Sequence, residues 1–288
     1  MRYLRTILLC VVLLALFVSL HSEFGYSADL LKRAQAGDAE AQILLGSCYD
    51  FGYGISKNAM EAVKWYRLAA NQGHAHAQNS LGYCYYYGEG VAQDYIEAIK
   101  WYRLSANQGD AEAQYCLGYC YYYGEGVARD YKEAVRWYRL AADQGHAAAQ
   151  NNLGVFYSNG QGVVQDYKEA VKWFRLAANQ GYASSQYNLG WMYDNGQGVV
   201  QDYKEAVKWY RKAADQVYAV AQHGLGGCYY FGDGVPKNKE EAYFWWLLAV
   251  ANGVEQGIEW RDDVARELTS AQRERVQARA TKWFEEHQ

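Results

Sequence analysis

Few residues in this sequence have both the type and the spacing that chemistry needs. His74 and His76 are separated by one residue near the start of an expected helix, and His146 occupies the equivalent of the first position later in the chain. No H-E-x-x-H motif or carboxylate-rich loop accompanies them, so we expect solvent-facing helix starts rather than metal ligands. Gly-x-Gly recurs, but never as the G-x-G-x-x-G that follows a strand and cradles a phosphate. We therefore predict no catalytic residue, no metal, no cofactor and no enzymatic activity.

Composition narrows the class of protein further. The chain has 288 residues, of which 51% are hydrophobic and 16% aromatic, so it can bury a large core. Its 28 basic and 32 acidic residues alternate and give a net charge of −4, without the basic stripe that follows a phosphate backbone. We expect no nucleic acid partner.

The amino terminus has the features of a secretory signal. Arg2 and Arg5 precede a mostly apolar run over residues 7–20, which is shorter than the roughly 20 residues that a membrane-spanning helix needs. We predict a signal peptide over residues 1–27, cleaved after Ser27 or, alternatively, after Ala28. The mature protein would then be exported, either periplasmic or secreted. An uncleaved signal would bring the protein to a membrane through this segment alone.

The elements that must position any functional residue follow a period of 36 residues, which holds for six units without insertion. Gly46 and Trp65 both recur at their own positions in every unit. The repeats are predicted over residues 38–73, 74–109, 110–145, 146–181, 182–217 and 218–253, and a helical cap over 254–288. A stack of such units buries the faces that one unit leaves open.

Two amphipathic helices are expected in each unit. Ala41 and Leu45 belong to the apolar stripe of the first, helix A, and Ala62 and Trp65 belong to that of the second, helix B. Glycines at residues 52–54 allow the chain to reverse between them. An Asx-x-x-Glu pattern marks the start of each helix B and is expected to form a capping box, in which the Asx accepts a backbone N–H and the Glu reaches back.

The glycines also predict how the helices pack. Gly46 and its equivalents lie inside helix A, where glycine costs about 1 kcal/mol relative to alanine, so we expect helices A and B to approach too closely for a Cβ atom. Each Trp65 equivalent is expected to fill the space between units. Gly73 and its equivalents should end helix B in a left-handed conformation. Val217 replaces that glycine in the fifth unit, which predicts strain of about 1 kcal/mol and fraying at the junction with the sixth.

The cysteines are predicted to be structural. Cys48, Cys84, Cys120 and Cys228 share one column with a phenylalanine and a methionine, as small buried hydrophobic residues do. Equivalent helices of adjacent units should lie about 8–10 Å apart, beyond the reach of a disulfide. Cys116 and Cys120 are four residues apart and could meet only with strain. We predict no disulfide.

Columns that vary between units are free of the demands of the fold and are therefore candidates for binding. On helix A the columns that begin at Glu40, Ile43, Leu44 and Ser47 share the face opposite the packed stripe. Asparagine can clamp an extended backbone, and Tyr and Trp are frequent hot spots of interfaces. The alternative is that these rings merely pack on the neighbouring helix A. The candidates are Asn79, Tyr83, Tyr115, Tyr119, Asn151, Asn152, Tyr187, Asn188 and Trp191.

The repeated pattern resembles a known family. A-x-A-Q-x-x-L-G-x-x-Y-x-x-G-x-G-V, which ends at Val91 in the second unit, and D-x-x-E-A-x-x-W, which begins at Asp94, are similar to the Sel1-like repeat, a relative of the tetratricopeptide repeat. The resemblance covers residues 38–253. It implies an all-α fold, a right-handed α/α superhelix or solenoid, whose A helices line a concave surface that binds peptides or proteins.

We therefore expect an exported, non-enzymatic adaptor that binds a protein or peptide ligand on its helix A face. Two alternatives stay open. A cysteine-rich bacterial branch of the family pairs two cysteines within each unit, and some members have been described as penicillin-binding or β-lactamase-like, so a cell-wall-active or β-lactam-hydrolysing protein is the first. This sequence lacks that pairing. The second is a structural subunit of an envelope or secretion complex.

Overall fold

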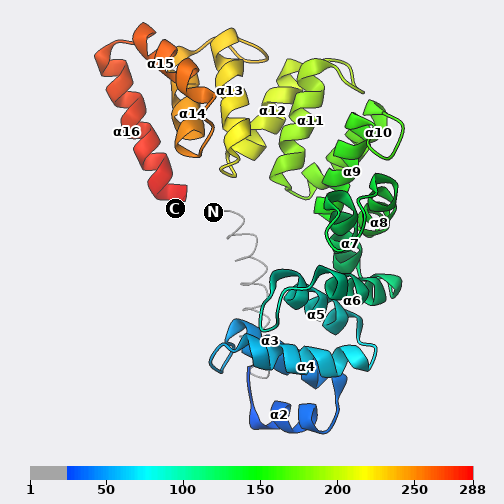
Figure 1. The fold of residues 1–288 in the computed structure, drawn as a ribbon. Helices are drawn as coiled ribbons and strands as arrows, with labels where there is room; N and C mark the ends of the chain where they lie inside the picture. Colours follow the sequence, from blue (N-terminus) through cyan, green and yellow to red (C-terminus); the bar gives the residue numbers. More distant parts are fainter. Residues whose placement is uncertain (1–24, 288) are drawn as a thin grey trace. The chain divides into compact units, whose positions relative to one another are not determined.

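The computed structural model describes residues 25–287, and within this range all the regular secondary structure is helical (Figure 1). A short helix, α2 (Ala28–Gln35), comes first. The A and B helices of the six repeats follow in alternation as α3 (Ala39–Phe51), α4 (Ala59–Asn71), α5 (Ala75–Tyr87), α6 (Tyr95–Asn107), α7 (Ala111–Tyr123), α8 (Tyr131–Asp143), α9 (Ala147–Asn159), α10 (Tyr167–Asn179), α11 (Ala183–Asn195), α12 (Tyr203–Ala214), α13 (Ala219–Phe231) and α14 (Lys239–Ala251). Two further helices, α15 (Gly257–Glu267) and α16 (Ser270–His287), complete the described chain. The predicted all-α fold of paired helices is confirmed.

The described residues form two compact units. The N-terminal unit comprises residues 25–149 and 161–164, and the C-terminal unit comprises 150–160 and 165–287, so that the division falls within α9. None of the described helices is both long and apolar enough to cross a membrane.

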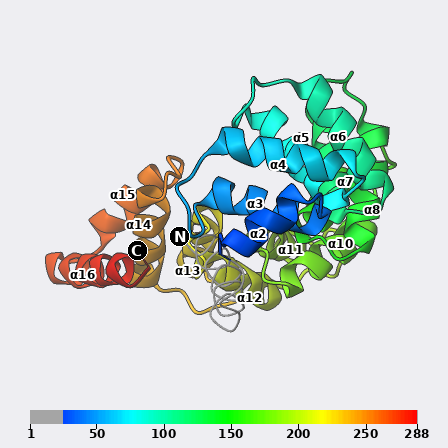
Figure 2. The same ribbon diagram turned by 90° about the horizontal axis from the view of Figure 1, so that it is seen from below.

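The predicted signal peptide lies mostly outside the described residues, but its last residues belong to the fold. The backbone N–H of Tyr26 donates to the carbonyl of Tyr53 at 3.1 Å. The hydroxyl of Ser27 accepts from the N–H of Leu30 at 3.0 Å and caps α2. Leu30 is buried with Leu45 of α3, and α2 lies beside α3 (Figure 2). This helix α2 was not expected from the sequence, and it occupies the place of a helix B ahead of the first repeat.

Of the two hydrogen bonds predicted for each helix B capping box, the one accepted by the Asx is present and the one accepted by the Glu is not. Asp94 accepts from the N–H of Glu97 at 3.0 Å, as expected. Glu97 does not reach back, however, because its carboxylate binds Lys100 at 2.7 Å. The N–H that it was expected to satisfy, that of Asp94, donates instead to the carbonyl of Tyr85 in the preceding helix A at 2.9 Å. The cap therefore joins helix B to helix A of the same repeat.

The close approach predicted at the Gly46 column is present, and aromatic rings cause it. A Cβ atom at Gly46 would lie 2.6 Å from Cδ1 of Tyr66 in α4. In the other repeats, a Cβ atom at the equivalent glycine would likewise collide with an aromatic ring. That ring belongs to the Tyr, Phe or Trp that directly follows the repeated Trp. The aromatic residue therefore occupies the volume of the missing side chain, and each repeat is locked by a ring over a glycine.

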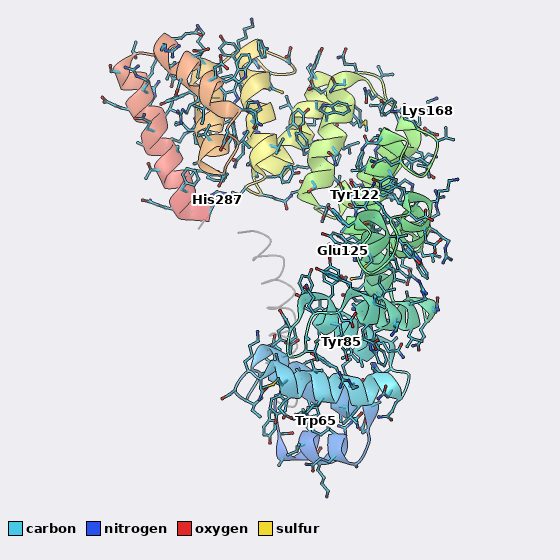
Figure 3. All side chains as sticks on the ribbon, in the orientation of Figure 1. Trp65, Tyr85, Tyr122, Glu125, Lys168 and His287 are labelled. Carbon is cyan, nitrogen blue, oxygen red and sulfur yellow. The ribbon has the colours of Figure 1, made fainter. Side chains whose placement is uncertain are left out.

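The repeated Trp lies between units, as predicted. Trp65 of α4 packs against the cluster formed by α2 and α3 (Figure 3). Trp101 of α6 packs in the same way against residues of α4 and α5, and Trp137 of α8 against residues of α6 and α7. Each of these rings therefore contributes apolar contact between one repeat and the preceding one.

A buried glutamine on the A helices α3, α5, α7, α11 and α13 provides a second link to the helix that precedes each of them. The amide of Gln114 donates to the carbonyl of Ala106, at the end of the preceding helix B, at 3.1 Å. Its carbonyl accepts from Gln144, which follows helix B of its own repeat, at 2.8 Å. Gln42, Gln78, Gln186 and Gln222 make the same pair of bonds, with Asn252 in the place of the second glutamine for the last. We call this series the glutamine ladder.

Val217 has the strained conformation that its position predicts. Its φ is +64°, and it is the only described residue other than glycine with a positive φ. Gly181, the equivalent residue of the preceding repeat, has a φ of +90°. A β-branched side chain in this region of the backbone is disfavoured by contact of Cβ with the neighbouring carbonyl.

The last repeat is covered by α15 and α16. Val264, Val276 and Ala280 of these helices are buried in one cluster with Phe244 and other residues of α14. Salt bridges surround this contact, joining Arg275 to Glu240 and Arg279 to Glu241, each at 2.6 Å. The start of α16 has a capping box, since Thr269 and Gln272 exchange hydrogen bonds.

Candidate binding site

The candidate residues from the sequence lie along four A helices, and most of them line two cavities, one in each unit. The first has a volume of about 170 Å³ and lies in the N-terminal unit. We call it the tyrosine cavity; it is lined by Tyr83, Tyr86, Tyr87, Tyr102, Glu112, Tyr115, Cys116 and Tyr119. The second, in the C-terminal unit, has a volume of about 290 Å³. We call it the Trp191 groove; it is lined by Val155, Ser158, Asn159, Phe174, Tyr187, Asn188, Trp191 and Met192.

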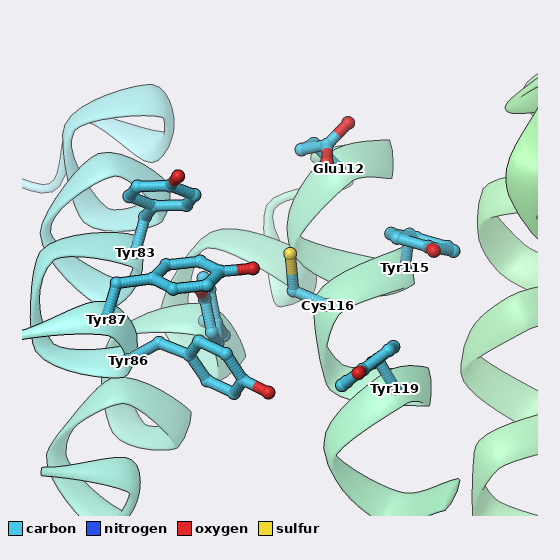
Figure 4. Close-up of a pocket in the computed structure, with 8 residues that line it drawn as sticks. Tyr83, Tyr86, Tyr87, Glu112, Tyr115, Cys116 and Tyr119 are labelled. Carbon is cyan, nitrogen blue, oxygen red and sulfur yellow. The ribbon is translucent and has the colours of Figure 1, made fainter. Parts of the chain in front are cut away.

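In the tyrosine cavity the rings of α5 face those of α7. Tyr83 and Tyr87 are one turn apart on α5, with ring centroids 4.4 Å apart. Tyr86 meets Tyr119 of α7 edge to face at 6.3 Å. Figure 4 shows these three α5 rings opposite Cys116 and Tyr119. The walls therefore present several aromatic surfaces of different orientation to one small space.

The hydroxyls and the thiol of this cavity are neutral groups. Burial raises the pKa of Tyr83, Tyr86, Tyr87 and Tyr119, so that the phenols stay protonated at physiological pH. The hydroxyl of Tyr86 donates to the carboxylate of Glu125. Burial also raises the pKa of the Cys116 thiol well above its ordinary value, which argues against a nucleophilic role.

Glu112 places a negative charge at the cavity. Its carboxylate lies 3.0 Å from Nε2 of His146, whose ring stacks on Tyr115 with centroids 4.7 Å apart. Nδ1 of His146 accepts the N–H of Ala149 at 3.2 Å, so this nitrogen carries no proton and Nε2 is the donor to Glu112. His146 therefore links the Glu112 carboxylate to the start of α9.

The histidines that the sequence singled out serve as links between repeats. His74 caps α5 and meets Glu40 of the preceding repeat at 3.0 Å, and His76 meets Asp110 of the following one at 2.7 Å. No group of three or more His, Cys, Asp or Glu residues within residues 25–287 is placed to hold a metal ion. The buried thiols of Cys84, Cys120 and Cys228 each have a pKa raised by burial to about 12.

In the Trp191 groove some of the candidate residues are engaged in the fold. Asn151 is buried, and its side-chain carbonyl accepts from Ser185 at 2.9 Å and from Asn188 at 3.1 Å. The ring of Tyr187 lies between those of Tyr210 and Tyr218, at 5.6 and 5.8 Å. Trp191 is 38% exposed. Packing therefore accounts for Asn151 and much of Tyr187, and leaves Trp191 as the open ring.

Some of the other candidates are exposed, as Trp191 is, and others are packed within the fold, as Asn151 is. Tyr83 is 44% exposed. Tyr119 and Asn152 are partly buried, as is Asn79, whose side-chain oxygen is buried with no hydrogen-bond partner among the described residues. Tyr115 is likewise partly buried, between His146 and Tyr138. The tyrosine cavity thus brings together Tyr83, Tyr115 and Tyr119, and the Trp191 groove brings together Tyr187, Asn188 and Trp191.

Sequence reasoning missed several lining residues that had a detectable signal. Tyr86 and Tyr87 lie three and four residues after Tyr83, on the same side of the last turn of α5. Their columns also vary between repeats, with Ser158 and Asn159 at the equivalent positions in the fourth. Glu112 belongs to the variable column that begins at Glu40, but only its contact with the cavity shows its role.

Comparisons with known proteins agree with this architecture. The family model described as Sel1 repeat matches residues 39–74, 75–110, 111–146, 147–182, 183–218 and 219–254. The chain is similar to a crystal structure of a Sel1 repeat protein from Oxalobacter formigenes, with 38% identity, a TM-score of 0.68, and coverage of 74% of this chain and 85% of that one. It is also similar to a protective antigen with an SLR fold from uropathogenic Escherichia coli, with 31% identity, a TM-score of 0.61, and coverage of 90% and 63%. No curated protein matches.

Proposed function

Because the chain belongs to the Sel1 repeat family, we propose that it is a scaffold without catalytic activity that binds a protein or peptide at the tyrosine cavity and the Trp191 groove. The observation that carries this proposal is that repeat positions with a constant residue hold the fold, whereas repeat positions with a varying residue line the two cavities. Residues that hardly change between repeats, such as Gly118 and Gln114, are engaged in packing and hydrogen bonds. Most residues that line the two cavities come from columns that change.

The cavities suit side chains of a partner better than a free small molecule. Both are smaller than the roughly 300–1,000 Å³ of typical small-molecule sites, and each lies between consecutive A helices. Exposed Tyr83 and Trp191 have the ring types that dominate binding energy at interfaces. An extended segment could place separate side chains in such hollows while its backbone follows the surface.

We further propose that the protein acts outside the cytoplasm, in the periplasm or after secretion. The charged and then apolar start of the sequence supports this, and a determination of the N-terminal residue of the protein recovered from cells tests it. Recovery of the uncleaved chain in the cytoplasmic fraction would contradict it.

The binding proposal is tested by selection from a displayed peptide library on the purified protein. Selected peptides are then measured against a variant with Y83A, Y119A and W191A together, which should weaken binding about tenfold or more, since such rings each contribute more than about 1 kcal/mol. The matched control is L68A, L104A and L140A, three leucines of B helices that are 47, 48 and 40% exposed and lie outside both cavities.

The control variant should bind with unchanged affinity, and both variants should keep the thermal transition of the parent. Equal weakening by the two variants, or full retention by the first, would exclude these cavities as the site. A library that yields no peptide would contradict peptide binding itself.

A further inference from the structure

We propose that the tyrosine cavity is a pocket for one cationic side chain, that of an arginine or lysine in the bound peptide. This inference rests on the proposed function and specifies the chemistry of the partner. It is carried by three features of the cavity: its aromatic walls, its one acidic lining residue and its size.

The walls provide the surfaces that attract a cation. The face of a tyrosine ring is electron-rich, and an ammonium or guanidinium group over it gains about 0.5–2 kcal/mol, depending on how far it is desolvated. Tyr83, Tyr87 and Tyr119 present rings from two helices, as seen in Figure 4. Tyr86 donates its hydroxyl proton to Glu125, which makes its ring a better partner for positive charge.

The charge of the cavity has one sign. Of the eight lining residues drawn in Figure 4, Glu112 is the one carboxylic acid, and the others are six tyrosines and a cysteine. The carboxylate of Glu125 lies directly behind Tyr86. The Glu112 carboxylate is mostly exposed, with a side chain that is 58% exposed, so it is accessible to a bound cation beside its contact with His146. An anionic or purely apolar side chain would gain no electrostatic attraction from these carboxylates.

The size limits the occupant to a single side chain, because about 170 Å³ is well below the volume of typical ligand pockets. The Trp191 groove offers an internal comparison. None of its lining residues is acidic, and Val155 and Asn159 stand where the fourth repeat would otherwise carry Tyr83 and Tyr87. The chemistry for a cation is therefore specific to the tyrosine cavity.

The test uses four peptides, acetyl-Gly-Gly-Xaa-Gly-Gly-amide with arginine, lysine, citrulline or glutamate as Xaa, titrated into the purified protein and followed by saturation-transfer NMR. Arginine and lysine peptides should bind at least about tenfold more tightly than the citrulline peptide, which has the shape of arginine without its charge. Equal binding of arginine and citrulline peptides would overturn the proposal.

Two pairs of variants separate the cavity from other acidic sites. E112Q should weaken binding of the arginine peptide about fivefold or more, whereas E40Q should not change it, although Glu40 makes the same 3.0 Å contact with His74, the histidine of the repeat that follows its own. Y119L should weaken binding and Y119F should retain it, since only the ring is required. Equal effects of E112Q and E40Q, or of Y119L and Y119F, would exclude the cavity as the site.

The same measurements distinguish failure of this inference from failure of the proposed function. Library peptides that lack basic residues and depend on Trp191 but not on Glu112 would refute the cationic pocket and leave peptide binding intact. Binding of free N-acetylarginine methylamide as tight as that of the arginine peptide would point to a small cation instead, and would refute a peptide side chain as the occupant.

Discussion

A methyl group added at Gly118 would lie 2.6 Å from Cδ1 of Tyr138, closer than carbon atoms pack in proteins. The Tyr138 ring is fully buried and has no free space into which it could turn. We therefore expect G118A to lower the free energy of unfolding by about 1–3 kcal/mol, the usual cost of overpacking, as measured by urea denaturation.

The matched control is G227A, at another glycine inside an A helix. A Cβ atom there would have no atom within 4 Å, so alanine should raise the free energy of unfolding by up to about 1 kcal/mol through its better helix propensity. Opposite signs for the two substitutions are the prediction. If both stabilise, the ring over Gly118 is not the reason for the glycine column.

The sequence could predict that these glycines mark a close approach, because their cost inside a helix recurs six times and needs a cause. It could not show that the ring after the repeated Trp fills the space, since both positions are aromatic in every repeat. Asn151 is a second example. The sequence predicted that its amide could bind a peptide, but in the structure its side-chain carbonyl accepts hydrogen bonds from Ser185 and Asn188. Contacts between residues about 36 apart are set by the stacking of repeats.

The turn that ends α12 contains the clearest strain within one element. Val217 has a φ of +64°, where its equivalents are glycines. Replacing it with glycine removes a cost of about 1–2 kcal/mol, partly offset by the greater freedom of glycine in the unfolded chain. We expect V217G to raise the free energy of unfolding by about 1 kcal/mol and to increase protection of the residues around this turn in hydrogen exchange.

G181V supplies the reverse experiment, because Gly181 has a φ of +90° in the preceding repeat. It should destabilise the protein by a similar or larger amount. Unchanged stability in both variants would show that the positive φ at this turn is not a source of strain. Hydrogen exchange in the parent protein also tests whether opening begins at this junction.

The order and the ends of the elements were predictable because each has a local chemical marker, such as the Asx at the start of helix B and the Gly at the end of helix A. The helix α2 was not predicted, since it lacks the Trp and Glu of the repeat and lies between the predicted signal and the first predicted repeat. The predicted bond from the Glu of the capping box back to the Asx N–H was wrong, because the backbone carbonyl of Tyr85, or of its equivalent in other repeats, accepts that N–H instead. Propensity rules treat a helix in isolation and do not include such a neighbour.

For the molecule as a whole, the half-buried histidine His223 of α13, whose Nδ1 atom is buried, predicts sensitivity to acid. Burial lowers its pKa below the ordinary value of 6.5, and its Nδ1 has no hydrogen-bond partner among the described residues. Below pH 6.5 the unfolded chain therefore binds more protons at this residue than the native one, and the free energy of unfolding falls as the pH is lowered.

Urea denaturation between pH 7.5 and 5 measures this effect, with H223Q as the comparison. The difference in stability between the parent and H223Q should shift steadily in favour of H223Q as the pH falls through 6.5. Parallel curves for the two proteins over this range would show that His223 does not cause the acid sensitivity.

The glutamine ladder has a consequence for how such a chain can change its length. Wherever both bonds of the ladder are described, the glutamine meets a carbonyl and a side-chain amide at the same spacing, so excision or duplication of one whole period within a unit would present each of these glutamines with a carbonyl and an amide in the positions that it already uses. A cavity, in contrast, depends on which two A helices are neighbours. In-frame recombination between repeats could therefore create a new recognition surface at the seam in a single genetic event, without any adjustment of the bonds that hold the array together.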